Sequence, residues 1–312
     1  MTGFPPRIQI VEVGPRDGLQ NETARLPTAE KIAFVDRLSA AGHTVIEVSA
    51  FVSPKWVPQM ADAADVFAGI RRRPGVRYTA LVPNLAGLAR AREAGVAEIA
   101  IFAAASETFS RRNINQTIEE SLATYRQVCQ EASAAGLRVR GYLSTCFGCP
   151  FEGAVAPSRV AEIAGRLFDL GVYEVAISDT IGVAHPGQVP AVVGEVALRV
   201  PVANLALHFH DTRGTALVNV FAGLEAGVTT FDSSAGGLGG CPYAPGAAGN
   251  LATEDLLYML DGLGIETGVE MMRVMEASRA IEPHLGHPLP SRIVQATKSH
   301  EKLTNNHTKD AK

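Results

Sequence analysis

The sequence predicts an α/β fold, a closed (β/α)8 barrel of parallel strands followed by a short C-terminal helical extension. Two observations support this fold class. Eight short β-rich runs recur along the 312 residues, and helix-like stretches alternate with them. Polar and charged residues stand at the carboxyl ends of several runs, where barrel enzymes carry their active groups.

The strands are expected where apolar and β-branched residues form short runs, as they do in strands that a barrel buries on both faces. The eight runs are residues 8–14, 44–50, 76–82, 98–104, 138–145, 174–180, 206–212 and 229–235.

The helices are expected between the strands, where apolar residues recur at helical spacing. They are residues 28–41, 85–94, 117–135, 158–170, 188–200, 215–226 and 253–263. Several end at a glycine suited to a helix C-cap, namely Gly42, Gly95, Gly136, Gly171 and Gly227. A doubly wound open sheet also alternates strand and helix, but it more often shows a Gly-rich fingerprint after its first strand. Here the first run leads into PRDGLQNE, so we predict a TIM barrel.

The domain organisation is simple. With 46% hydrophobic and 19% charged residues, the chain can bury one large core. No linker divides it before about Ile281. We therefore expect a catalytic barrel domain over residues 1–280 and an extension over residues 281–312, whose polar tail from Asn305 is expected to fray.

The composition also limits the classes of partner that the chain is expected to bind. The 32 acidic and 28 basic residues are well mixed, which argues against nucleic acid or an anionic membrane as a partner and favours a small molecule. No apolar run approaches the roughly 20 residues that span a bilayer. We expect no signal peptide, and four cysteines suit a reduced, cytoplasmic setting without a disulfide framework. Cys146 and Cys149 form a C-x-x-C, but without a second such pair we expect no structural zinc.

The H-x-H pattern of His208 and His210 is typical of metal ligands. Residues two apart on a strand point to the same side, here the barrel mouth. Asp17 is the natural third ligand, since only the eighth strand separates the first from the seventh once the barrel closes. Asn250 either supplies a fourth, neutral oxygen or caps the helix that follows. Such a set suits Mg²⁺ or Mn²⁺, while zinc and Fe(II) stay open.

Other charged residues also stand near strand ends. Arg16 pairs with an acid or stabilises an oxyanion at the barrel mouth. Glu47 lies in an apolar run, where an unpaired carboxylate is costly, so we expect it to have a partner and to orient Arg16. Asp179 and Glu12 fit either acid–base catalysis or structural pairing, and the structural reading is preferred for Glu12.

The segment GGLGGCPYAPGAAGN, residues 236–250, surrounds Cys241 with six glycines and two prolines. Such a composition excludes a helix or a central strand. A Gly-rich linker is the simple alternative. We interpret the segment as a mobile loop that delivers a thiol to the site.

Taken together, these motifs make the chain resemble the 3-hydroxy-3-methylglutaryl-CoA lyase family, metal-dependent barrels in a wider group that includes the isopropylmalate and homocitrate synthases. The matching segments are VEVGPRDGLQNE, IEVSAFVSPKWVPQM, SETFSRRNIN, SDTIGV, HFHDT and GGLGGCPYAPGAAGNLATED. The cysteine loop is typical of the lyases, whereas the H-x-H element alone indicates only the wider group.

The resemblance implies that a divalent cation, Mg²⁺ or Mn²⁺, is held by Asp17, His208, His210 and Asn250. It also implies that Arg16 contacts the substrate thioester and that Cys241 acts from a closing loop. We assign Gln20 and Glu12 to substrate binding beside Arg16. A homodimer or higher homo-oligomer is a family-level expectation.

The implied reaction is metal-dependent cleavage of 3-hydroxy-3-methylglutaryl-CoA to acetyl-CoA and acetoacetate. Asp17, His208, or a water that Glu47 orients are the candidate bases. Three alternatives stay open: a lyase for a longer branched 3-hydroxyglutaryl-CoA analogue, an acetyl-CoA-dependent 2-oxo acid synthase, and an inactive scaffold that binds metal or CoA. Leucine degradation, ketone-body formation and terpenoid breakdown are the candidate routes.

Overall fold

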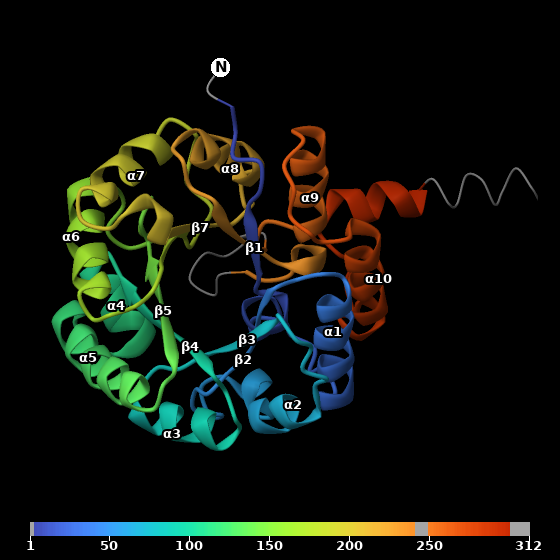
Figure 1. The fold of residues 1–312 in the computed structure, drawn as a ribbon, viewed down its shortest axis with the longest axis horizontal. Helices are drawn as coiled ribbons and strands as arrows, with labels where there is room; N and C mark the ends of the chain where they lie inside the picture. The colour runs from blue at the N-terminus through green and yellow to red at the C-terminus, as the bar shows by residue number, and fades with distance from the viewer. Residues whose placement is uncertain (1–2, 241–248, 300–312) are drawn as a thin grey trace, which may run out of the picture.

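The structure, a computed structural model, describes residues 3–240 and 249–299, which form a closed barrel of eight parallel strands (Figure 1). The strands follow one another in chain order, and β8 pairs with β1 to close the barrel. They are β1 Gln9–Glu12, β2 Val45–Ala50, β3 Arg77–Leu81, β4 Glu98–Ala104, β5 Arg138–Ser144, β6 Val175–Asp179, β7 Leu205–Phe209 and β8 Thr230–Ser233. Each predicted run overlaps one strand, and only β7 begins before its run, by one residue, so the predicted fold class is confirmed.

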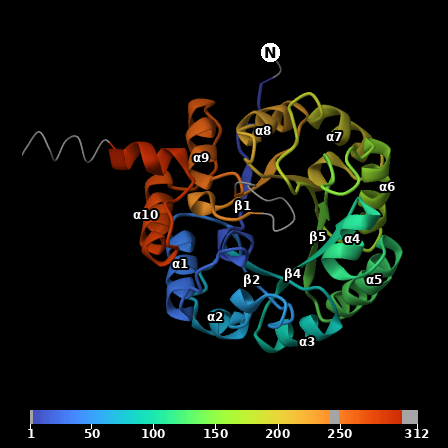
Figure 2. The same cartoon turned by 180° about the vertical axis from the view of Figure 1, so that it is seen from behind.

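Helices surround the ring of strands, as Figures 1 and 2 show from opposite sides. The seven predicted helices correspond to α1 Thr28–Ala40, α3 Leu85–Glu93, α5 Ile118–Ala134, α6 Pro157–Phe168, α7 Val189–Ala197, α8 Ala216–Glu225 and α9 Thr253–Gly262. Within the described ranges, helices α2 Ala63–Gly69, α4 Glu107–Ile114 and α10 Met271–Ile281 were not predicted. Residues 292–299 are also helical and lie in the predicted C-terminal extension. Short helical turns are η1 Gly14–Gly18, η2 Pro58–Met60, η3 Val202–Asn204, η4 Ala235–Gly237 and η5 Glu282–His284.

The main core lies between the strands and the outer helices. Phe34 and Leu38 of α1 and Tyr125 and Val128 of α5 are almost fully buried there. Burial of each such side chain stabilises the fold by about 1.5–3 kcal/mol. The glycines predicted to cap helices adopt positive φ, 101° at Gly42 for example, so these C-caps are confirmed.

The part of the chain after α9 packs against the barrel. In Figure 1, α10 lies beside α1, and the two helices are in contact. Leu285, Leu289 and Val294 join the same hydrophobic core as the barrel helices. The domain boundary at residues 280 and 281 stays a prediction, and the tail from Asn305 lies outside the described residues.

Along the described ranges, no helix combines the length and apolarity needed to cross a membrane. Cys129, Cys146 and Cys149 are buried and free.

Candidate active site and metal centre

A cavity of about 610 Å³ opens at the carboxyl ends of the strands. Its wall includes the predicted site residues Arg16, Asp17, Gln20, His208 and His210. The barrel therefore brings together side chains that lie up to 194 positions apart in the sequence. This is the end of the fold where loops of different strands converge on a single site.

A tight turn after β1 holds two of these residues. In η1, the carbonyl oxygen of Val13 accepts hydrogen bonds from the backbone N–H groups of Arg16, Asp17 and Gly18, at 3.2, 2.8 and 3.1 Å. A Cβ atom on Gly18 would lie 2.7 Å from Ser234 Oγ, so any larger residue would force Ser234 or the turn to move. The turn thereby fixes the direction in which the Arg16 and Asp17 side chains leave the backbone.

Arg16 joins two carboxylates. Its Nε donates to Glu47 Oε2 at 2.6 Å, and one terminal nitrogen donates to Asp17 Oδ1 at 2.7 Å. Its guanidinium carbon lies 5.4 Å from the centre of the Tyr142 ring. Glu47 is fully buried, and burial raises its pKa although Arg16 opposes the shift. The expectation that Glu47 pairs with an arginine is confirmed.

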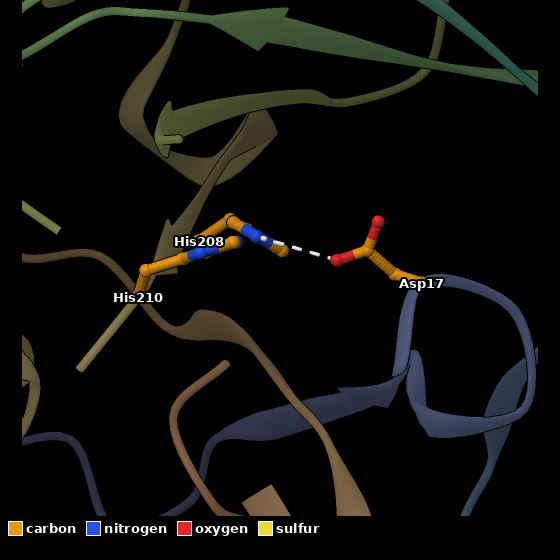
Figure 3. A group of neighbouring side chains, drawn as sticks. All are labelled: Asp17, His208 and His210. Carbon is orange, nitrogen blue, oxygen red and sulfur yellow. Dashed lines mark ion pairs between the residues drawn. The ribbon is translucent and has the colours of Figure 1, made fainter. Parts of the chain in front are cut away.

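Asp17, His208 and His210 form a cluster suited to a metal ion. One potential ligand atom from each lies within 4.8 Å of the others, and His208 Nε2 is 3.9 Å from Asp17 Oδ2 (Figure 3). Burial would raise the pKa of Asp17, but Arg16 and the two histidines outweigh it and hold the pKa at about 2. Burial and the neighbouring His208 lower the pKa of His210 to about 4. An ionised carboxylate and a neutral imidazole are the forms that bind metal.

Asn250 completes one side of this cluster. Its Nδ2 donates to Asp17 Oδ2 at 2.9 Å and to the Leu238 carbonyl oxygen at 3.1 Å. Helix α9 has Ala252 at its N-cap, so the alternative role of Asn250 as a helix cap is wrong. Within the described ranges, the buried atoms Asn250 Oδ1 and His210 Nδ1 have no hydrogen-bond partner. Unsatisfied buried polar atoms beside a carboxylate and two imidazoles fit a divalent cation.

Behind the cluster, buried polar residues that the sequence analysis missed support His208. Its Nδ1 lies 3.2 Å from Asp232 Oδ2, and Asp232 accepts a hydrogen bond of 2.8 Å from Arg140. Burial would lower the pKa of His208, but the hydrogen bond and charge of Asp232 outweigh it and raise that pKa above its ordinary value. The signal available in the sequence was a charged residue inside two barrel strands, Arg140 in β5 and Asp232 in β8.

Two predicted site residues, Glu12 and Asp179, lie outside the cavity wall. Glu12 is fully buried behind the turn, where its carboxylate accepts hydrogen bonds from the backbone of Gly14 and Ala235 and from the Thr253 hydroxyl. It is not among the cavity-lining residues, so the structure favours the structural alternative over substrate binding.

Asp179 also pairs with backbone. Its two oxygens accept the N–H groups of Val183 and Ala184, both at 2.9 Å, and the side chain is 1% exposed. The neighbouring Ser178 and Thr180 line the cavity, but Asp179 does not. The structure thus favours structural pairing over acid–base catalysis for this residue.

Cys241 lies outside the described residues, as do residues 242–248 of the glycine-rich loop. The described residue before it, Gly240, lines the cavity, and its carbonyl oxygen accepts a hydrogen bond of 2.8 Å from Asn21. The catalytic role of Cys241 therefore stays a prediction.

Comparison with known proteins gives consistent results. The HMGL-like family model matches residues 7–281. The chain is 53% identical to the mitochondrial hydroxymethylglutaryl-CoA lyase of Rattus norvegicus, over 95% of this chain and 91% of the relative. It is 54% identical to a 3-hydroxy-3-isohexenylglutaryl-CoA/hydroxymethylglutaryl-CoA lyase of Pseudomonas aeruginosa, over 94% and 98%.

Solved structures agree with these sequence relatives. An HMG-CoA lyase of Acinetobacter baumannii in complex with coenzyme A and 3-methylmalate superposes with a TM-score of 0.90 at 40% identity. That match covers 95% of this chain and 97% of the solved one.

Proposed function

This chain belongs to the HMGL-like family, and we propose on that premise that it cleaves 3-hydroxy-3-methylglutaryl-CoA to acetyl-CoA and acetoacetate. It is a carbon–carbon lyase that acts on a small-molecule CoA thioester. One observation carries the proposal most directly: the cluster of Asp17, His208 and His210 shares a cavity with Arg16. Metal ligands and an oxyanion-stabilising cation are the two groups that a retro-Claisen cleavage needs side by side.

The metal is a divalent cation, and we propose Mg²⁺ or Mn²⁺. Asp17, His208, His210 and Asn250 would hold it, since carboxylate and amide oxygens with imidazole suit these ions and leave positions for substrate. When bound, such an ion lowers the pKa of a substrate hydroxyl and stabilises negative charge.

Each remaining site residue has a separate role in the cleavage. A base drawn from Asp17, His208 or a water held by Glu47 takes the proton of the C3 hydroxyl. The C2–C3 bond breaks, its electron pair moves into the thioester fragment, and the C3 oxygen becomes the ketone of acetoacetate. Arg16, held by Glu47 at 2.6 Å, stabilises the oxyanion that forms on the thioester. Cys241 protonates the departing carbon, which completes acetyl-CoA.

A longer branched substrate is the second candidate. The relative from Pseudomonas aeruginosa carries both activities in its name. Apolar side chains from neighbouring strands and helices, including Leu81, Phe102 and Tyr125, line the cavity beside the polar groups. They would accommodate an apolar C3 substituent larger than methyl, so we expect measurable turnover of such an analogue.

The test measures acetoacetate and acetyl-CoA released by metal-stripped protein with and without Mg²⁺ or Mn²⁺ under reducing conditions. We expect both products only with metal. A His210→Ala variant, with a ligand removed, should lose metal binding and at least about 10³ in rate. Folded, metal-loaded protein that releases neither product would contradict the lyase proposal, and turnover of a longer analogue alone would move it to the second candidate.

We further propose a homodimer or higher homo-oligomer, a cytoplasmic location, and a place in leucine degradation or ketone-body formation. The free thiols of Cys129, Cys146 and Cys149 support a reducing compartment. Size-exclusion chromatography with light scattering tests the oligomeric state.

A further inference from the structure

Below the metal cluster, a buried chain of hydrogen bonds runs through the barrel interior. His208 Nδ1 contacts Asp232 Oδ2 at 3.2 Å, and the other Asp232 oxygen accepts from Arg140 at 2.8 Å. Arg140 also donates to Glu174 at 2.7 Å and to the Tyr142 hydroxyl at 2.9 Å. Its guanidinium group is thus the junction of the chain.

The chain continues to the substrate side and closes on itself. The Tyr142 hydroxyl donates to Glu47 at 3.3 Å, and Glu47 accepts from Arg16 at 2.6 Å. Arg16 contacts Asp17 at 2.7 Å, and Asp17 lies 3.9 Å from His208 Nε2. We call this closed sequence of seven side chains the polar ring: His208, Asp232, Arg140, Tyr142, Glu47, Arg16 and Asp17.

Arg140 fixes the direction of the hydrogen bonds that it makes and of those made by its partners Tyr142 and Asp232. A guanidinium group can only donate. The Tyr142 oxygen therefore accepts from Arg140, and its own proton is directed to Glu47. Asp232, ionised between Arg140 and the imidazole, can only accept, so His208 Nδ1 must be the donor. With Nδ1 donating to Asp232, His208 presents Nε2 to the cluster that faces Asp17.

We propose that Arg140 is a positioning residue that couples the metal ligand His208 to the substrate-facing Arg16. It fixes the His208 tautomer through Asp232 and the direction of Arg16 through Tyr142 and Glu47. This inference rests on the proposed function, because it assigns a metal to His208 and a substrate contact to Arg16.

Burial makes this coupling specific. Arg140 and Asp232 are each 2% exposed and Glu47 is fully buried, so none can exchange its partner for water. Such groups are costly unless every partner is in place, and one displaced member disturbs the rest. The polar ring with Glu174 holds two guanidinium groups and four carboxyl groups, and each guanidinium group contacts two of the carboxyl groups.

Arg140→Lys tests the junction, because lysine keeps the charge but cannot donate to three partners in the fixed fork of a guanidinium group. In metal-free protein, at a pH high enough to leave His208 neutral, side-chain ¹H–¹⁵N spectra report the His208 tautomer, assigned by comparison with His208→Gln. We expect the wild type to carry the proton on Nδ1 and Arg140→Lys to show a mixture of tautomers. In Mn²⁺ titrations the variant should bind about 10- to 100-fold more weakly.

Arg77→Lys is the matched control. Arg77 begins β3 at the opposite end of the barrel, where it donates to Glu98 at 3.0 Å and to the Tyr173 hydroxyl at 3.2 Å. It has the same kinds of partner as Arg140 but lies outside the cavity wall. This variant should keep the wild-type tautomer and Mn²⁺ affinity even if it loses stability.

A double-mutant cycle tests the coupling itself. Tyr142→Phe cuts the polar ring on the Arg16 side, and Asp232→Asn weakens it on the His208 side. If the two substitutions acted independently, the fold-changes of the single variants in Mn²⁺ affinity and in KM would multiply in the double variant. We expect the double variant to differ from that product by about threefold or more. In the Arg140→Lys background this difference should vanish. Independent effects, or an unchanged His208 tautomer in folded Arg140→Lys, would overturn the proposal. Wild-type protein that binds no Mn²⁺ would instead overturn the proposed metal site, and the tautomer spectra would still decide the role of Arg140.

Discussion

At the scale of single residues, a substitution of Asp179 can distinguish a structural role of its carboxylate from a catalytic one. Its hydrogen bonds to the backbone of Val183 and Ala184 hold the loop after β6. In Asp179→Asn only one oxygen remains to accept. We therefore expect unfolding free energy to fall by about 1–3 kcal/mol while kcat changes less than about tenfold. Chemical denaturation and initial rates measure the two effects. A kcat loss of about 10³ at unchanged stability would restore the acid–base role.

Glu12 gives stability a pH dependence. Burial raises its pKa from the ordinary 4.5 to about 8. The folded protein therefore holds this proton more tightly than the unfolded chain does. The contribution of Glu12 to stability is complete below pH 4.5 and is lost as the pH rises through about 8, by about 1.4 kcal/mol per pH unit.

Glu12→Gln removes this titration and keeps an oxygen for the N–H groups of Gly14 and Ala235. Between pH 5 and pH 8, its unfolding free energy in urea should therefore decline less steeply than that of the wild type. Equal declines in both proteins would mean that Glu12 is already ionised in the folded state near neutral pH.

At the scale of elements, the turn η1 depends on a close approach of backbone and side chains. A methyl group on Gly18 would meet Ser234 Oγ at 2.7 Å and Leu238 Cβ at 3.1 Å. We expect Gly18→Ala to shift Asp17, to weaken Mn²⁺ binding, and to destabilise the fold by about 1–3 kcal/mol. Gly194→Ala in α7 is the matched control, because its Cβ would meet nothing within 4 Å. If both variants bind Mn²⁺ like the wild type, the turn does not position the ligand.

The same elements explain which parts of the fold could be predicted. Barrel strands are continuous apolar runs, and α1 and α5 carry apolar stripes, so local pattern identifies them. Helix α2 has seven residues and α4 has eight, of mostly polar sequence ETFSRRNI, so each is too short for apolar spacing to identify it. Their helical state depends on contacts with the barrel and on caps such as Ser106, whose side chain accepts from Phe109 N–H.

For the site, the sequence was sufficient where spacing or strand order determines geometry. The H-x-H spacing and barrel closure place His208, His210 and Asp17 together. Local sequence could not assign Arg140 and Asp232, because β5 and β8 are not neighbours in the barrel and these side chains meet only across its interior. Local sequence could not identify the partners of Glu12 either, since Ala235 and Thr253 come from the far end of the chain.

At the scale of the whole molecule, one side chain can report on occupancy of the cavity. Trp56 is the only tryptophan of the chain, lies on the cavity wall and is 87% exposed. It belongs to the segment between β2 and α2, whereas Arg16 lies on the turn after β1. A ligand as long as a CoA thioester, with its acyl group at Arg16, would extend along the wall toward the rim.

We therefore expect acetyl-CoA to quench and blue-shift tryptophan emission in a saturable way, because the ligand removes water from the indole ring. The midpoint should equal the Kd measured by calorimetry on the same protein. Trp56→Phe removes the signal and serves as the control for inner-filter effects, while calorimetry should still detect binding to it. If calorimetry detects binding but tryptophan emission does not change, the CoA part of the bound thioester extends along another side of the cavity and does not contact Trp56.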